Sequence, residues 1–433
     1  MAKPQILVLA PQDAMTALSA AGFPLAGEDG LRRQTAAIVV ETRGEAGAKA
    51  ADLVRSLRAA LGPRAGLFFA WSDGNPDQDV SGFDGILDCG ASPTALAARL
   101  NSSLRIAVMA DEARLRFKSL GKFGGAPKPP TLHTQHQPRI LVFGPPGPDM
   151  LRFTSALEVR GAQAVASFTS FTAFDYLHNG DFDGVAIVAQ DDVASSLGFC
   201  AAMRRNARLF HMPCMVLGSP DFAKPEEAIS RGATDFAILG DDDGASAERL
   251  LDFVDEKRSR DALVLAFAAA RAPHAMDQGT GLYVADFFKS HLESLVARAH
   301  ETDRPLSVAC VRIAPDPVTN ALKSGRGLDR LVGQAGAMMA RLVRAEDVAA
   351  RLDRTTFVVA FPSSDEDAAD IAARRIAAVL ECTAFDGGSD VTAYSNDAPL
   401  QIKMHIACAA LLPTDSALDL LSRVQVRLPS ERL

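Results

Sequence analysis

Short apolar runs alternate with helical patterns through the first two thirds of the chain. Residues 4–9 (PQILVL) and 138–143 (PRILVF) open alike, each as a brief apolar run followed closely by proline. Short runs of branched residues bounded by turn residues are typical of buried parallel strands. Each of the two segments is therefore predicted to be the first strand of a separate βα unit.

Further strand candidates follow each opening, and helical segments separate them. These candidates are centred on or begin at Ile38, Phe68, Ile86, Asp183, Pro213 and Gly232. Because strands that alternate with helices form parallel sheets, the pattern predicts two flavodoxin-like (βα)5 domains in tandem. Residues 121–137 lie between them and are rich in Gly, Pro and polar residues, which is typical of a linker.

The last third of the chain follows another pattern. A helical pattern over about residues 245–271 ends before Pro273, since proline breaks a helix. Beyond it we expect a helix, a strand, a second helix and a β-hairpin, at residues 285–299, 307–314, 329–344 and 348–361. A tight hairpin among helices indicates an α+β palm. We therefore expect an α/β multidomain protein divided into residues 1–120, 121–137 (the linker), 138–272 and 273–433.

Composition and charge exclude several functional classes. A chain of 433 residues, 48% of them apolar, indicates about three well-packed domains. The net charge of −8 disfavours a nucleic-acid partner, because such binding depends on Lys and Arg that neutralise phosphates. The six cysteines include no C-x-x-C pair, and the longest apolar stretch, residues 262–270, is far shorter than the ~20 residues that cross a bilayer. We therefore expect a cytoplasmic protein without zinc, disulfides or membrane insertion.

Two segments of the third unit resemble a known family. Residues 277–283 (DQGTGLY) are similar to the D-x-L-T-G-L-Y opening of GGDEF domains. Residues 348–362 (VAARLDRTTFVVAFP) are similar to the hairpin that gives this family its name. The whole chain resembles response regulators built from two receiver domains and a GGDEF domain. The resemblance implies a nucleotidyl-cyclase-like palm as the third domain and receivers as the first two.

The resemblance also implies a degenerate catalytic site. In the family, hairpin glycines admit the GTP phosphates, and carboxylates on the hairpin and the preceding strand bind a divalent metal. Here the hairpin positions are filled by Asp353, Arg354, Thr355, Thr356 and Phe357. Arg312 stands where the resemblance places the strand aspartate, and a unit charge facing a divalent ion at 4 Å costs roughly 8 kcal/mol at an effective dielectric of ~20. We therefore expect no metal, no cofactor and no catalysis.

Other nucleotide contacts of the family are partly retained. Asn320 and Asp329 match its guanine contacts, so a vestigial GTP site is one interpretation. A helix-start Asn and an N-cap-like Asp explain the same residues equally well. Residues 419–433 lack the A-L-Y-x-A-K segment through which the family contacts phosphate.

A second ligand site of the family is retained. Arg344 and Asp347, in the segment RAED, match its R-x-x-D inhibitory site at unshifted spacing from the hairpin. Arginine can fork to guanine O6 and N7 or to phosphate, and a carboxylate can accept from guanine N1 and N2. The resemblance implies cyclic di-GMP as the ligand, with Arg375, or alternatively Arg374, as a further contact. Without the resemblance, Arg344 and Asp347 are interpreted as an exposed helix end with an i,i+3 ion pair worth about 0.3 kcal/mol. Arg375 is then interpreted as part of a solvated helix face.

Both receiver-like units lack the residues of phosphotransfer. The resemblance implies acidic residues after the first strand, an Asp after the third and a Lys after the fifth. Instead, these strand ends carry Ala10-Pro11, Gly144-Pro145, Glu41-Thr42, Val188-Ala189 and Leu239. Glu41 is either a fixed negative charge or a solvated strand-end residue. We therefore expect these domains to serve as docking and dimerisation surfaces.

These observations together favour an effector rather than an enzyme. Resemblance to degenerate members of the family implies a homodimeric adaptor that is recruited to a cell pole during the cell cycle. It further implies protein partners in a pathway that delivers a transcriptional regulator to the ClpXP protease through another adaptor. Two alternatives remain: an active or residual diguanylate cyclase, and a scaffold that does not respond to a ligand.

Overall fold

The computed structural model describes residues 5–26, 35–47, 49–73, 79–125, 136–189, 193–219, 225–315, 326–386 and 400–429. The chain divides into two compact units. One contains Pro4–Ile106 and Leu132–Ala262, and the other contains Met1–Lys3, Ala107–Thr131 and Leu263–Leu433. In the described ranges, no helix combines the length and the apolar character needed to cross a bilayer.

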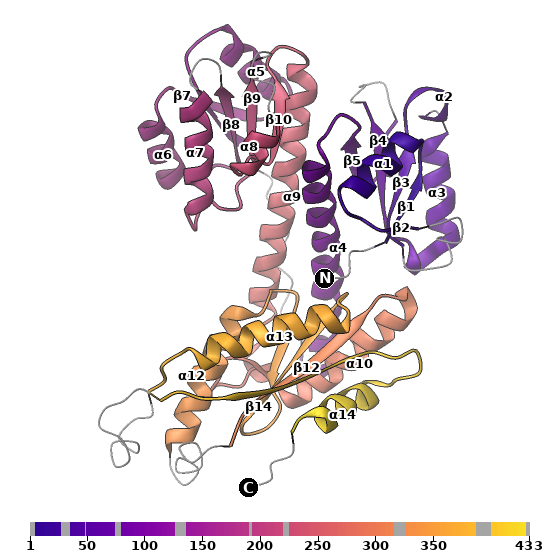
Figure 1. Ribbon diagram of the computed structural model, residues 1–433, viewed down its shortest axis with the longest axis vertical. Coiled ribbons are helices and arrows are strands. Elements are labelled where there is room, and N and C mark those ends of the chain that lie inside the picture. Colours follow the sequence, from indigo (N-terminus) through magenta and orange to yellow (C-terminus); the bar gives the residue numbers. More distant parts are fainter. Residues whose placement is uncertain are drawn as a thin grey trace. The chain divides into compact units, whose positions relative to one another are not determined.

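The first sheet is parallel, with the strand order β2-β1-β3-β4-β5 (Figure 1). Its strands are β1 (Gln5–Leu9), β2 (Leu25–Ala26), β3 (Thr35–Glu41), β4 (Leu67–Ser72) and β5 (Gly85–Asp88). The helical segments are α1 (Gln12–Ala20), α2 (Gly44–Gly47), α3 (Ala50–Leu61), the 3-10 turn η2 (Gly62–Arg64) and α4 (Pro93–Phe123). Ile38 and Val39 belong to apolar clusters on opposite faces, so β3 is buried on both sides, as in other parallel sheets.

The second sheet is also parallel, with the strand order β10-β9-β8-β6-β7. Its strands are β6 (Arg139–Phe143), β7 (Gln163–Ser167), β8 (Gly184–Ala189), β9 (Cys214–Gly218) and β10 (Asp235–Ile238). The helices are α5 (Pro148–Val159), α6 (Ser170–Asn179), α7 (Val193–Arg205), α8 (Pro225–Ser230) and α9 (Asp243–Ala269). Both sheets therefore have the order 2-1-3-4-5 of flavodoxin-like folds.

The third sheet is mixed, with the strand order β11-β13-β14-β12-β15. Its strands are β11 (Tyr283–Val284), β12 (Leu306–Ile313), β13 (Val348–Arg351), β14 (Thr356–Pro362) and β15 (Met404–Ala410). The helical segments are η4 (Pro273–Ala275), α10 (Ala285–Thr302), α12 (Arg326–Leu342), α13 (Glu366–Glu381) and α14 (Ala417–Arg427). The helix, strand, helix and hairpin expected from the sequence are thus all present, with β13 and β14 as the antiparallel hairpin strands.

Helices cover both faces of this third sheet (Figure 1). Val308 and Cys310 of β12 pack in one apolar cluster with residues of α10 and α14. Ala309 and Val311 pack in another with residues of α12 and α13. The alternation of side chains along a strand therefore builds two cores from one sheet.

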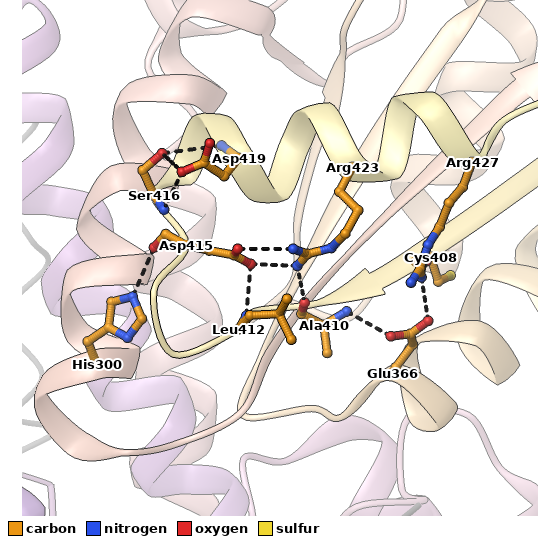
Figure 2. Close-up of polar contacts among 10 residues, drawn as sticks. All are labelled: His300, Glu366, Cys408, Ala410, Leu412, Asp415, Ser416, Asp419, Arg423 and Arg427. Atoms are coloured by element: carbon orange, nitrogen blue, oxygen red, sulfur yellow. Dashed lines mark hydrogen bonds and ion pairs between the residues drawn. The ribbon is translucent and has the colours of Figure 1, made fainter.

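The outer edge of β15 is partly occupied by side chains. The backbone N–H of Met404 donates to Glu381 at 2.8 Å, and that of Ala410 donates to Glu366 at 3.1 Å. Arg427 pairs with the same Glu366 and donates to the carbonyl oxygen of Cys408 (Figure 2). Edge strands with open backbone groups invite pairing with other chains, so these contacts protect the edge.

Helix α12 approaches the turn of residues 277–281 closely, because two of its positions are glycine. A Cβ atom at Gly333 would lie 2.9 Å from the carbonyl oxygen of Gly279. A Cβ atom at Gly336 would lie 2.4 Å from Cβ of Thr280. Real Cβ atoms do not approach other atoms so closely, so the two glycines fix how near α12 comes to this turn.

We predict that Gly336→Ala destabilises the protein although alanine favours helices. Alanine gains about 1 kcal/mol over glycine inside a helix, whereas overpacking of this kind costs about 1–3 kcal/mol. Gly198, inside α7, has no atom within 4 Å of its virtual Cβ and is the matched control. In urea unfolding, Gly336→Ala should lower the midpoint and Gly198→Ala should raise it. A midpoint for Gly336→Ala at or above the wild-type value would contradict the packing described here.

Candidate functional site

The predicted R-x-x-D segment is a tight turn between α12 and β13. The backbone N–H of Arg344 donates to Oδ2 of Asp347 at 3.0 Å. The backbone N–H of Asp347 donates back to the carbonyl oxygen of Arg344 at 3.2 Å. These reciprocal hydrogen bonds hold the two residues at a fixed spacing, with the arginine exposed and the aspartate only 9% exposed.

The carboxyl group of Asp347 has an unusual protonation equilibrium. Burial raises its pKa from 3.8 to about 7, and the neighbouring carboxylate of Glu346 adds to this rise. The hydrogen bond from the backbone of Arg344 and the charges of Arg344 and Arg116 oppose the rise without cancelling it. Asp347 is therefore partly protonated near neutral pH, and a ligand that requires the carboxylate form must release that proton.

Two of the three candidate arginines lie at this turn. Arg375, on α13, donates from Nη2 to the carbonyl oxygen of Leu342 at 3.2 Å, two residues before Arg344. Arg374 instead pairs with Asp370 on its own helix at 2.6 Å. In the part of the chain that the structure describes, no hydrogen bond or ion pair involves the guanidinium of Arg344. The geometry therefore favours Arg344 and Arg375 over Arg374 as ligand contacts.

The hairpin loop bonds its own backbone. Oδ1 of Asp353 accepts hydrogen bonds from the backbone N–H groups of Thr355 and Thr356, at 2.9 and 2.8 Å. Arg351 donates to the carbonyl oxygens of Asp353 and Arg354, at 3.1 and 3.3 Å. No residue of this fully described loop has a positive φ. Backbone N–H groups are what a loop offers to phosphate, and here two of them are already bonded to a carboxylate.

The strand positions beside the hairpin carry basic and neutral side chains. Arg312 on β12 is paired in register with Thr356 on β14 and with His405 on β15. The guanidinium of Arg312 donates to the carbonyl oxygen of Pro429. Its Nε atom and Nδ1 of His405 are buried without a hydrogen-bond partner. A divalent cation needs oxygen ligands, so this row of side chains does not fit a metal ion.

Of the two predicted guanine contacts, Asp329 is paired with a neighbouring cation. Asp329 is exposed on α12, where Nε of Arg354 lies 3.7 Å from its carboxylate. The arginine that replaces a hairpin glycine thus pairs with a predicted guanine contact. Asn320 lies outside the residues that the structure describes.

The cations of α14 are engaged within the domain (Figure 2). Arg423 pairs with Asp415 at 2.5 Å and also donates to the carbonyl oxygen of Ala410. Arg427 is paired with Glu366 at 2.5 Å. Both arginines therefore neutralise carboxylates of the domain. Across the described ranges, no group of three or more His, Cys, Asp or Glu side chains is arranged to hold a metal ion.

One residue of this region has no signal in the sequence. Arg116, on α4, donates to the carbonyl oxygens of the R-x-x-D turn, although it precedes Ala345 by 229 residues. An arginine inside a regular helical pattern, so far from the motif, could not have been linked to it without the structure.

Comparison with known families identifies the C-terminal domain. The family described as diguanylate cyclase, GGDEF domain, matches residues 274–431. The chain therefore contains a GGDEF domain, and the prediction of such a domain is confirmed. No curated protein matches the chain.

The similar solved structures include three bacterial GGDEF proteins. The GGDEF domain of FimX from Pseudomonas aeruginosa is 24% identical, covering 35% of this chain and 90% of that one, with a TM-score of 0.31. The GGDEF domain of DgcB from Caulobacter crescentus, in complex with c-di-GMP, is 17% identical, covering 35% and 84%, with a TM-score of 0.32. The diguanylate cyclase SiaD from Pseudomonas aeruginosa, in complex with its activator SiaC, is 15% identical, covering 42% and 65%, with a TM-score of 0.32.

We predict that Asp347→Asn removes a pH dependence of stability. The native pKa of about 7 exceeds the ordinary 3.8, so the native state holds a proton that the unfolded state releases between these values. The contribution of Asp347 to stability therefore falls as pH rises from about 4 to about 7 and is constant above that. Three pKa units correspond to at most about 4 kcal/mol.

Urea unfolding of both proteins at pH 4 and pH 7.5 measures this effect. Relative to wild type, Asp347→Asn should become more stable as pH rises, by a few kcal/mol in total. Asp329→Asn, which alters an exposed carboxylate of the same domain, is the control and should not show the change. Equal pH dependence in wild type and Asp347→Asn would contradict the burial of this carboxyl group.

Proposed function

We propose, taking the GGDEF domain of residues 274–431 as the premise, that this chain is a cyclic di-GMP effector. It binds the dinucleotide at the turn of Arg344 and Asp347 and does not synthesise it. The observation that carries the proposal is a contrast within one domain. The guanidinium of Arg344 is available at its turn, whereas the hairpin amides of Thr355 and Thr356 are bonded to Asp353.

The turn offers groups that complement guanine and phosphate. The guanidinium of Arg344 can fork to O6 and N7 of guanine, as arginine does in nucleic-acid recognition. Asp347 uses Oδ2 within the turn, so Oδ1 is the atom that accepts from N1 and N2 of the base. Arg375, beside the same turn, supplies a second cation for the other guanine or for a phosphate.

Catalysis is disfavoured by the side chains of the hairpin and of the strands beside it. A diguanylate cyclase must hold GTP phosphates and a divalent metal, which neutralises the charge of the transferring group. Arg312 and His405 provide no oxygen ligand, and Thr356 is a buried hydroxyl where the family has a carboxylate. A diguanylate cyclase with an unorthodox site is the alternative that this arrangement makes least favourable.

The first two domains, residues 1–120 and 138–272, act in this proposal as degenerate receivers that dock partners. Both sheets have the flavodoxin-like strand order, which is the order expected of receivers. At the carboxyl end of β3, Glu41 is bonded to Arg43 at 2.8 Å, and Arg43 also bonds Asp13. The charge of Glu41 is therefore neutralised locally, which supports a role in docking rather than in phosphotransfer.

The partners follow from the resemblance drawn from the sequence. The layout resembles PleD and its degenerate relative PopA, and this likeness supports a cytoplasmic, homodimeric adaptor at a cell pole that acts in ClpXP-dependent proteolysis. Ligand binding at the GGDEF domain then controls which proteins dock. A scaffold that ignores the nucleotide shares the same architecture, and only a binding measurement separates the two.

We predict that Arg344→Ala abolishes most of the affinity for cyclic di-GMP. Arg344 is exposed in the free protein, but a bound dinucleotide would bury its guanidinium in a charge pair. Truncating one partner of such a pair costs about 2–5 kcal/mol, which is a thirtyfold to several-thousandfold loss. Isothermal titration calorimetry of the full chain measures it. Arg374→Ala is the matched control, because Arg374 pairs with Asp370 on its own helix. The affinity of this variant for cyclic di-GMP should stay within about twofold of wild type. Absence of heat with wild type would leave the scaffold alternative.

We predict no formation of cyclic di-GMP by the purified protein. Incubation with GTP and Mg²⁺, followed by chromatographic detection of the product, tests this. The triple variant with Arg312→Asp, Asp353→Gly and Thr355→Glu is a useful comparison, since it introduces the metal ligands that the resemblance implies and frees the hairpin amides. Product made by wild type and lost on altering Thr355 would establish the cyclase alternative.

A further inference from the structure

We infer that Arg116 is a positioning residue of the R-x-x-D turn, through which dinucleotide binding is coupled to the packing of residues 107–123. This inference rests on the proposed function. Residues 107–123 are the C-terminal part of α4 and belong to the same compact unit as the GGDEF domain. The candidate is therefore an intramolecular part of the site that lies far from it in the sequence.

The guanidinium of Arg116 bonds three consecutive carbonyl groups of the motif. Nη1 donates to the carbonyl oxygen of Ala345, and Nη2 donates to those of Glu346 and Asp347, each at 3.2 Å. The planar fork of an arginine suits such a row of acceptors, and a lysine ammonium does not reproduce it. Of the four residues of the motif, three are thus held by one side chain.

The guanidinium is itself held rigidly. Glu112, one helical turn earlier, pairs with it at 2.9 Å. The ring of Phe267 lies under it, 4.5 Å from its central carbon to the ring centroid. His291, on α10, bonds the same oxygen of Glu112 at 2.9 Å and, through its other ring nitrogen, Ser119. Since every member of this cluster is buried, the fork has little freedom to move.

Arg116 acts on a ligand only through the turn. Its side chain is 4% exposed, so a ligand bound at the surface does not touch it. What it fixes is the backbone of residues 345–347, which sets the hydrogen bond between the N–H of Arg344 and the carboxyl group of Asp347. Its charge also lowers the pKa of Asp347 and thus opposes the larger effect of burial. Both effects favour the geometry and the charge state that guanine recognition requires.

Coupling of this kind is reciprocal. If contact with Arg116 stabilises the ligand-binding form of the turn, a ligand that binds this form stabilises the packing of residues 107–123 by the same free energy. Binding should therefore be visible in α4, although the buried side chain of Arg116 does not touch the ligand. A residue with a merely structural role would not show this response.

The test combines calorimetry with hydrogen exchange on the full chain, using cyclic di-GMP as the probe. Removing Arg116 alone would leave Glu112 buried without its cation, so the variant is Glu112→Gln with Arg116→Met. We expect a ten- to hundredfold loss of affinity, the range that corresponds to losing charge-assisted hydrogen bonds. Arg116→Lys keeps the charge without the fork and should fall between the variant and wild type.

Arg298→Met is the matched control. Arg298, on α10, pairs with Asp111 of α4 at 2.7 Å and makes no contact with the turn. Its replacement loosens the same helical segment, and affinity should remain within about twofold of wild type. An equal loss in Arg298→Met and in the double variant would overturn the inference, because general loosening of α4 would then explain both.

Hydrogen exchange in the wild-type protein tests the coupling independently of calorimetry on the Arg116 variants. In wild type, saturating cyclic di-GMP should slow amide exchange in residues 107–123, and Arg344→Ala should abolish this slowing. Unchanged exchange in wild type that does bind the ligand would refute the coupling while leaving the proposed function in place. No binding by wild type would instead refute the proposed function itself.

Discussion

Backbone groups at the ends and the edge of the third sheet need partners that the strands do not supply. A buried N–H or carbonyl group without a partner costs as much as a lost hydrogen bond, so side chains must provide what the sheet lacks. Glu381 and Glu366 accept from the edge of β15, Asp353 accepts from the hairpin, and Asp347 accepts from its own turn. The placement of these carboxylates decides which surfaces of the domain remain open.

The need for backbone hydrogen-bond partners is met differently at the two candidate ligand sites. At the hairpin, the carboxylate of Asp353 accepts hydrogen bonds from the amides of Thr355 and Thr356, and Arg354 pairs with Asp329. At the R-x-x-D turn, Asp347 and Arg116 provide hydrogen-bond partners for the backbone, and within the described residues the guanidinium of Arg344 has no hydrogen bond or ion pair.

The sequence predicted the elements well, because their signals are local. Short apolar runs marked β12 and β14, and helical patterns marked α10 and α12. Arg344 and Asp347, which are three residues apart in the sequence, are also joined by a hydrogen bond in the structure, since a four-residue turn is a local structure.

Contacts between segments that are distant in the sequence could not be predicted from residue patterns. The choice between Arg374 and Arg375 depends on which of two adjacent helical positions faces the end of α12, and no pattern of residues decided it. The hydrogen bonds from two amides to Asp353 were not predicted, because they depend on the conformation of the hairpin loop rather than on a residue pattern. Arg116 depends on the packing of α4, which leaves no trace near the motif.

The cap formed by Asp353 has a consequence for how such a domain can change over evolutionary time. As long as its carboxylate accepts from the amides of the loop, a single substitution elsewhere in the hairpin does not create an anion-binding loop, since any phosphate there would meet an anion. Removing the cap first exposes bare amides and weakens the hairpin. Loss of the cap and gain of new side chains at the hairpin are therefore each unfavourable alone, and this epistasis favours retention of the cap once it has formed.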